Sequence, residues 1–161
     1  MSVKNNGTIL FSEKVICGLS VDIFSIMMPN QYDPKAIPTA WQKFWTTFPK
    51  VSLPRDSKAY GVSLPIESEP GKLHYVAGVE VSKNFLAPVG FEVCVIPAGN
   101  YLYIEHVGNI MNLASSYGEA YGVEFPKTRL QMRPAPHLEL YSSDLNPMAD
   151  DYRMGILIPV N

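Results

Sequence analysis

Two periodicities alternate along the chain and predict most of its elements. Over residues 13–24, apolar positions alternate with more polar ones, as in a strand with one buried face. Over residues 37–48, apolar side chains recur at helical spacing, which predicts an amphipathic helix ended by Pro49. The same alternation predicts strands at residues 58–64, 73–81, 91–96, 101–106, 137–142 and 154–160.

A second helix is predicted after the strand at residues 101–106. Gly108 and Asn109 open it, an apolar stripe runs along it, and Gly122 is a natural stop. The proline-broken segment 125–136 is then expected to be a loop. The polar, mixed residues 1–8 precede the first predicted strand.

The order of these elements repeats. Residues about 9–85 and about 91–161 each contain a strand–helix–strand–strand unit, which indicates an internal duplication. Two main helices on a mostly antiparallel sheet make an α+β fold. Junctions between equivalent halves are frequent ligand sites, so we expect one domain over residues 1–161 with a central ligand pocket.

One predicted strand carries an unusual pair of side chains. In a strand, Leu138 and Leu140 share a face that is ready for burial, and Glu139 and Tyr141 share the other. A carboxylate beside an aromatic ring suits a bulky, flat organic cation, because the ring face carries negative quadrupole and the carboxylate supplies the countercharge. The alternative is a glutamate that is simply solvated on the outer face of a half-buried strand.

Aromatic side chains are the second feature that indicates a ligand. Trp41 and Trp45 lie about one helical turn apart, and each indole N–H needs a partner when buried. Together with tyrosines from the strands, they can wall a pocket for a planar cation. The candidate ligand-binding residues are Glu139, Tyr141, Trp41, Trp45, Tyr75 and Tyr103.

Composition narrows the function classes. The 161 residues are 47% hydrophobic and only 17% charged, and a net charge of −2 leaves no basic face for direct binding of nucleic acid. No stretch has the length of a membrane span or the regions of a signal peptide, so a cytoplasmic protein without a membrane partner is expected. Cys17 and Cys94 lie in apolar, strand-like settings, which favours structural thiols over a disulfide.

Motifs for catalysis and cofactors are missing. The chain has no glycine-rich phosphate loop and no nucleophile elbow, and its three histidines lack metal-ligand spacing. No cofactor or metal is therefore expected, and the sequence favours binding over catalysis. A second hypothesis stays open, in which the chain is a small hydrolase of electrophilic compounds with Glu139 as acid or base.

Several short stretches carry a family resemblance by their order and spacing. They are residues 15–19 (VICGL), the helix with Trp41 and Trp45, and residues 60–62 (YGV), 75–81 (YVAGVEV), 96–101 (IPAGNY), 106–108 (HVG), 138–141 (LELY) and 156–160 (ILIPV). Together they resemble the GyrI-like small-molecule-binding domain. This is also the effector-binding domain of bacterial AraC- and MerR-type multidrug regulators.

The resemblance implies a duplicated fold with a central pocket. In the regulators, a glutamate on the pocket floor meets lipophilic cations; by position it is Glu139 here, and Tyr141 also lines the pocket. The regulators carry a DNA-binding module for which this chain has no room, so a stand-alone domain is expected, acting in drug sequestration or in sensing through a partner such as a regulator. Some members hydrolyse small electrophiles and one inhibits DNA gyrase, so a hydrolase, a gyrase-interacting protein and an oligomer stay open.

Overall fold

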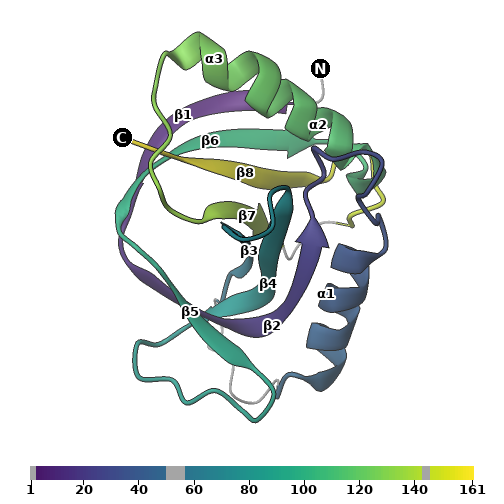
Figure 1. Cartoon of the computed structure of the whole chain (residues 1–161), viewed down its shortest axis with the longest axis vertical. Helices are drawn as coiled ribbons and strands as arrows, with labels where there is room; N and C mark the ends of the chain where they lie inside the picture. The colour runs from purple at the N-terminus through teal and green to yellow at the C-terminus, as the bar shows by residue number, and fades with distance from the viewer. Residues whose placement is uncertain (1–2, 50–56, 143–145) are drawn as a thin grey trace.

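Eight antiparallel strands form one sheet in the order β1-β6-β8-β7-β3-β4-β2-β5 (Figure 1). The structure is a computed structural model that describes residues 3–49, 57–142 and 146–161. The strands are β1 Val3–Phe11, β2 Lys14–Phe24, β3 Ala59–Pro65, β4 Lys72–Val81, β5 Glu92–Ile96, β6 Gly99–Val107, β7 His137–Tyr141 and β8 Arg153–Val160. The helical segments are α1 Ala36–Thr47, η2 Ile110–Asn112, α2 Leu113–Glu119, η3 Ala120–Glu124 and α3 Phe125–Thr128.

The sheet consists of two equivalent halves that meet where β3 pairs with β7. One half contains β2, α1, β3 and β4, and the other contains β6, α2, β7 and β8 in the same order along the chain. The halves exchange their outer strands, because β1 precedes β2 but pairs with β6, and β5 precedes β6 but pairs with β2. The α+β fold with duplicated strand–helix–strand–strand units is therefore confirmed.

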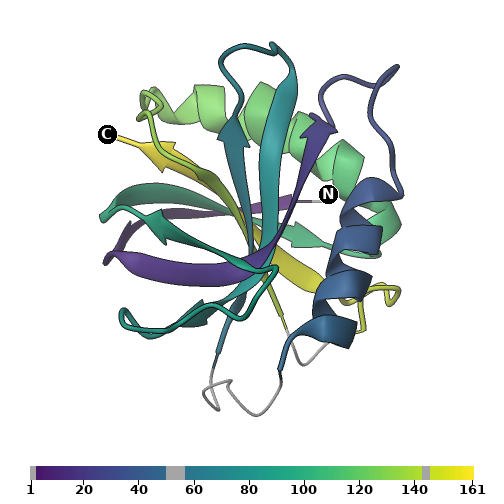
Figure 2. The same cartoon turned by 60° about the horizontal axis from the view of Figure 1, so that its bottom comes forward.

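The two helical layers cover different halves of the same sheet face. The side chains of Phe44 and Trp41 in α1 pack against β2 and β4, and those of Leu113 and Tyr117 in α2 pack against β6 and β8. The opposite face curls around a separate core, in which Phe11 from one sheet edge and Ile96 from the other belong to a single cluster. Figure 2 shows this curvature, with the two helical segments lying on the outside of the curled sheet.

The N-terminal strand β1 was missed by the sequence patterns. Only Val3 and Phe11 at its ends are buried, and most positions between them are exposed. Gly7 takes a φ of 80°, and the register with β6 shifts between Asn5 and Thr8. An edge strand with one exposed face and an irregularity near its middle carries no apolar alternation, so its sequence looks like a polar tail.

The second helix does not end at Gly122, which corrects the prediction. The chain stays helical from Ile110 to Thr128, with a π-helical turn at Ala120–Glu124. A proline cannot donate a backbone hydrogen bond and clashes with the carbonyl four residues before it, and the wider π turn accommodates Pro126 in the next turn. The helix ends where Arg129 adopts a left-handed φ of 61°. The predicted start is confirmed, because the Asn109 side chain accepts a hydrogen bond from the Met111 N–H.

Candidate functional site

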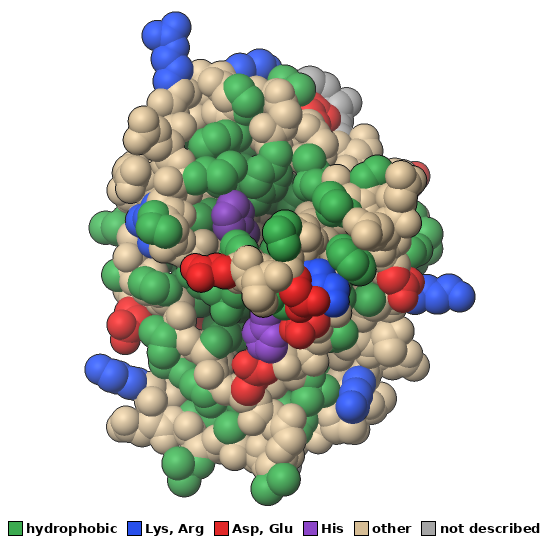
Figure 3. Space-filling view, in the orientation of Figure 1, with side chains coloured by type: hydrophobic (Ala, Val, Ile, Leu, Met, Phe, Trp, Pro, Cys, Tyr) green, Lys and Arg blue, Asp and Glu red, His purple; other side chains and the backbone are tan. Residues whose placement is uncertain are grey.

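A cavity of about 200 Å³ lies on the helical side of the sheet, between the two helical layers. Its floor comes from the central strands β3, β4 and β7, and its sides come from α1, α2 and the loop after β2. On the face in Figure 3, hydrophobic side chains surround a hollow, and histidine and acidic side chains lie close by. The apolar lining includes Ile23, Ile26, Met27, Ile37, Leu73 and Leu113.

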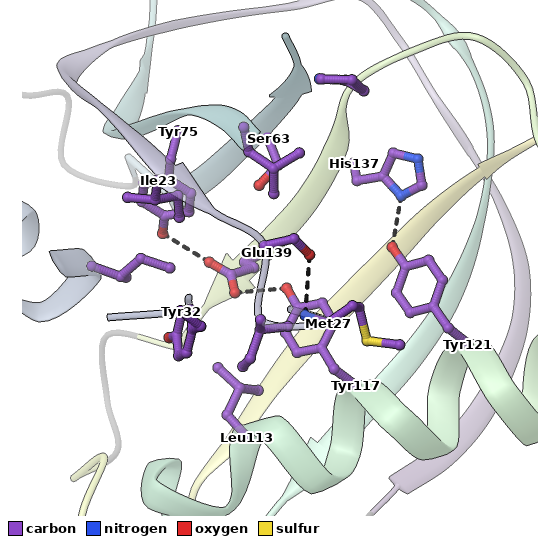
Figure 4. A pocket seen from close by; sticks show the side chains of 15 residues that line it. Ile23, Met27, Tyr32, Ser63, Tyr75, Leu113, Tyr117, Tyr121, His137 and Glu139 are labelled. Carbon is purple, nitrogen blue, oxygen red and sulfur yellow. Dashed lines mark hydrogen bonds between the residues drawn. The ribbon is translucent and has the colours of Figure 1, made fainter. Parts of the chain in front are cut away.

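Glu139 is the central polar group of this cavity. The residue is only 3% exposed, yet its carboxylate belongs to the cavity lining (Figure 4). Leu138 is buried on the opposite face of the strand, as the alternation predicted. The lining contains no lysine or arginine, and in the described part of the chain Glu139 makes no ion pair. A buried carboxylate without a cation is costly unless hydrogen bonds stabilise it.

Three tyrosine hydroxyl groups supply those hydrogen bonds. Tyr75 and Tyr141 donate to Oε1 of Glu139 at 2.8 and 2.7 Å, and Tyr117 donates to Oε2 at 2.7 Å. Burial, and to a smaller extent the charge of Glu139, raises the pKa of all three hydroxyls well above the ordinary value for tyrosine. The hydroxyls therefore remain proton donors. An ionised carboxylate accepts about four hydrogen bonds. Oε2, with one donor, therefore keeps capacity for a ligand.

Trp41 connects α1 to this hydrogen-bond network from outside the cavity lining. Its Nε1–H donates to the Tyr75 hydroxyl at 2.9 Å, and its ring lies 4.9 Å from that of Tyr141. Because the Tyr75 proton points to Glu139, its oxygen is free to accept the indole N–H. The four side chains Trp41, Tyr75, Tyr141 and Glu139 thus form one connected group, although of these only Tyr75 and Glu139 line the cavity.

Two further candidates from the sequence lie outside the lining. Trp45 stacks on Trp41 at 6.1 Å and is 42% exposed, so it contacts solvent rather than the cavity. Tyr103 packs against the core on the other face of the sheet, because it pairs with Leu157, which in turn pairs with Leu138. Directly paired residues share a face, which puts Tyr103 and Glu139 on opposite sides.

The site also contains residues that the sequence interpretation left out. Tyr121 and His137 line the cavity, and the Tyr121 hydroxyl and His137 Nδ1 lie 2.6 Å apart. The Tyr121 ring stacks between two others, with its centroid 5.9 Å from that of Tyr117 and 5.8 Å from that of His137. Two signals in the sequence point to them: the four-residue spacing of the tyrosines, and the position of His137 on the same strand face as Glu139.

Gly61 makes this floor possible. It pairs with Glu139 on one side and with Ala77 on the other, and Tyr75 crosses over it to reach the carboxylate. A Cβ atom at this position would lie 2.5 Å from Oε1 of Glu139 and even closer to the Tyr75 hydroxyl. Only glycine leaves room for the hydrogen bond between these two side chains.

Three other features of the described residues bear on function: their metal-ligating side chains, their cysteines and the length of their helices. No cluster of histidine, cysteine, aspartate and glutamate there could hold a metal ion. Cys17 and Cys94 are both free thiols, and burial raises their pKa values. No helix among residues 3–49, 57–142 and 146–161 is long and apolar enough to cross a membrane.

The fold and the cavity between its two helical layers define a domain of the small-molecule-binding class. A family model described as "GyrI-like small molecule binding domain" matches residues 25–161, and the chain belongs to this family. It is also similar to the transcriptional regulator BrlR of Pseudomonas aeruginosa, with 24% identity over 122 residues. That match covers 74% of this chain and 44% of the regulator, so the chain spans less than half of this relative's length.

Solved structures share the fold at low identity. The structure of SAV2435 bound to tetraphenylphosphonium has a TM-score of 0.75 and 17% identity, covering 100% of this chain and 94% of that chain. The C-terminal domain of EcmrR has a TM-score of 0.68 and 15% identity, covering 100% and 99%. A structure from Listeria innocua described as a hydrolase has a TM-score of 0.55 and 12% identity, covering 99% and 92%.

Proposed function

We propose that this chain binds hydrophobic, planar organic cations, with Glu139 as the countercharge, and serves in effector sensing or sequestration. The observation that carries the proposal is that Glu139 is a 3% exposed residue whose carboxylate lines the cavity, with no lysine or arginine among the described lining residues. A ligand cation at 4 Å from such a carboxylate gains about 4 kcal/mol of Coulomb energy at an effective dielectric constant near 20. A neutral or anionic compound gains none of this.

The tyrosines contribute in two ways. Their hydroxyl groups hold Glu139 in one orientation, so little reorganisation is needed when a cation enters. The rings of Tyr75 and Tyr117, together with the apolar lining, offer flat surfaces whose negative faces attract cations. The relative SAV2435, which is solved with the cation tetraphenylphosphonium, supports this ligand class for the fold. The similarity to BrlR supports a role as the effector-binding part of a sensing system.

A matched pair of ligands tests the proposal. N-methylquinolinium and 1-methylnaphthalene have nearly the same flat shape and differ in charge, and binding of both can be followed by calorimetry. We expect the cation to bind more tightly than the hydrocarbon. Glu139→Gln should weaken cation binding by about 1–3 kcal/mol and leave the hydrocarbon nearly unchanged. Glu105→Gln, on β6 and paired with Arg153 at the surface, is the control and should change neither.

The outcome is decided by the preference for charge. If Glu139→Gln binds the cation as tightly as the parent, the carboxylate does not recognise ligand charge and the proposal is wrong. Equal affinity of the parent for both compounds would have the same meaning. Because the ligands are matched in shape, neither result can be attributed to a change in cavity size.

Hydrolysis of a small electrophile is the second candidate function. The observation in its favour is that Glu139 and the Tyr117 hydroxyl, 2.7 Å apart, lie together in an apolar cavity, where a carboxyl group can act as acid or base. One similar structure is described as a hydrolase. A panel of reactive esters and strained-ring electrophiles tests this candidate. Turnover that is lost in both Glu139→Gln and Tyr117→Phe would support it, and turnover at the background rate would exclude it for those substrates.

A further inference from the structure

The floor of the cavity has a second polar end, formed by His137 and Ser63. On β7, His137 and Glu139 point to the same face and are two residues apart, which separates their Cα atoms by about 7 Å. On β3, Ser63 pairs with His137 in the way that Gly61 pairs with Glu139. The floor therefore carries a charged end and an uncharged, hydrogen-bonding end side by side.

The tautomer of His137 follows from its one hydrogen-bond partner within the described residues, Tyr121. Burial lowers the pKa of this imidazole, so it is neutral at neutral pH. Nδ1 of His137 is the acceptor that lies within reach of the Tyr121 hydroxyl in the described residues, and the assignment that pairs the hydroxyl proton has Tyr121 donating to Nδ1. The imidazole proton is then on Nε2. Figure 4 shows the ring with Nδ1 turned to Tyr121, and Nε2 on the side away from that bond.

Nε2 of His137 and the hydroxyl of Ser63 are open to a ligand. Neither atom has a hydrogen-bond partner within residues 3–49, 57–142 and 146–161, yet both residues line the cavity. Neither atom is sealed away, because the described part of the chain contains no buried side-chain nitrogen or oxygen without a partner. A ligand that reaches this end can therefore accept a hydrogen bond from Nε2–H of His137.

We propose that His137 selects ligands that carry a hydrogen-bond acceptor, such as a carbonyl oxygen, about 7 Å from the cationic centre that meets Glu139. This inference rests on the cation-binding function proposed above and adds a second recognition point to it. Purely hydrocarbon cations fill the same cavity without using Nε2–H. The pocket thus discriminates among cations by a neutral group, which the charge of Glu139 alone cannot do.

Three aromatic cations test the inference on the unmodified protein. In (4-acetylbenzyl)trimethylammonium, the nitrogen and the carbonyl oxygen are about 7 Å apart by standard bond lengths. The 4-isopropyl compound has nearly the same shape without an acceptor, and the 3-acetyl compound places the carbonyl in another direction. We expect the 4-acetyl compound to bind about threefold to tenfold more tightly than either, which corresponds to one net hydrogen bond. Equal affinity of the 4-acetyl and 4-isopropyl compounds would overturn the inference.

Variants then assign the preference to a residue. His137→Phe keeps a ring to stack on Tyr121 and removes Nε2–H, so the affinity ratio of the 4-acetyl to the 4-isopropyl compound should fall to about one. Any general damage to the fold affects both ligands and cancels in this ratio. His74→Phe, whose imidazole contacts Asp22 and Glu92, is the control and should keep the parent ratio. A parent ratio that persists in His137→Phe would refute the role of His137.

Failure of this inference differs from failure of the proposed function. If the parent binds the 4-acetyl and 4-isopropyl compounds equally, and both lose affinity in Glu139→Gln, cation binding is correct and selection by His137 is wrong. If neither compound binds, or if Glu139→Gln leaves both affinities unchanged, cation binding itself is wrong and the inference falls with it. Calorimetry of the full chain gives all of these affinities.

Discussion

Replacement of Gly61 by alanine tests the crowding at the centre of the site. The new Cβ would lie 2.5 Å from Oε1 of Glu139 and closer still to the hydroxyl of Tyr75, both well inside normal contact distance. Strand backbone on both sides prevents Gly61 from moving away, because β3 is paired with β4 and with β7. We therefore expect Tyr75 to be displaced and its hydrogen bond to Glu139 to be lost.

The magnitude follows from two terms. A hydrogen bond to a charged group contributes about 1.5–3 kcal/mol, and overpacking a dense region costs about 1–3 kcal/mol. Gly61→Ala should therefore lower the free energy of unfolding by about 2.5–6 kcal/mol. For a chain of this size, the middle of that range shifts the midpoint of thermal unfolding down by roughly 10 °C. Urea unfolding followed by circular dichroism measures the free energy directly. N-methylquinolinium should also bind more weakly.

A control and a double-mutant cycle make the test specific. Gly118 is exposed in α2, and a Cβ added there would meet no atom within 4 Å, so Gly118→Ala should stabilise the protein by about 1 kcal/mol. In a Tyr75→Phe background, the hydroxyl that crowds the new methyl group is absent. Gly61→Ala should then cost at least about 1 kcal/mol less than in the parent. If the two costs are equal, or if Gly61→Ala is as harmless as Gly118→Ala, the crowding argument is wrong.

Three further predictions concern individual side chains. Trp41→Phe removes the indole N–H that donates to Tyr75 and should destabilise the protein by about 1–2 kcal/mol in the same urea assay. Trp45→Phe, at a 42% exposed position, should cost much less, and equal costs of the two substitutions would contradict the role of the Trp41 hydrogen bond. For His74, desolvation lowers the pKa, but hydrogen bonds to Asp22 and Glu92 outweigh it and raise the pKa above 6.5. The stability difference between the parent and His74→Asn should therefore be full below about pH 6.5 and fade as the pH rises through the raised pKa. A difference that grows toward pH 8 would refute this. For His137, burial lowers the pKa, so the imidazole is neutral at pH 7.5 and gains its positive charge, beside the ligand, only when the pH falls through the lowered pKa. Binding of N-methylquinolinium should therefore weaken more with acidification in the parent than in His137→Phe, and equal pH dependence of the two proteins in calorimetry would count against this prediction.

Local patterns in the sequence were sufficient to predict most of the helices and strands. The alternation in β2 is strongest at Leu19, Val21 and Ile23, which pack on the side of α1, while Ser20 and Asp22 between them are exposed. Trp41, Phe44 and Phe48 recur at helical spacing because one side of α1 packs on the sheet. The face of Glu139 also follows from alternation, since Leu138 beside it is buried in the opposite core. Patterns fail where burial is weak, as in β1, or where a helix continues through Gly122 and Pro126.

The sequence by itself determined which side chains can share a face, because strand and helix periodicities depend only on neighbouring residues. It therefore identified Glu139 and Tyr141 as partners and the tryptophans of α1 as an aromatic group. Only the tertiary structure decided which of these side chains line the cavity. Tyr75, Tyr117 and Glu139 meet because the two halves of the sheet pair through β3 and β7, and the small size of Gly61 matters only at that crossing. Contacts between residues far apart in the chain depend on strand order and register, which no local pattern specifies.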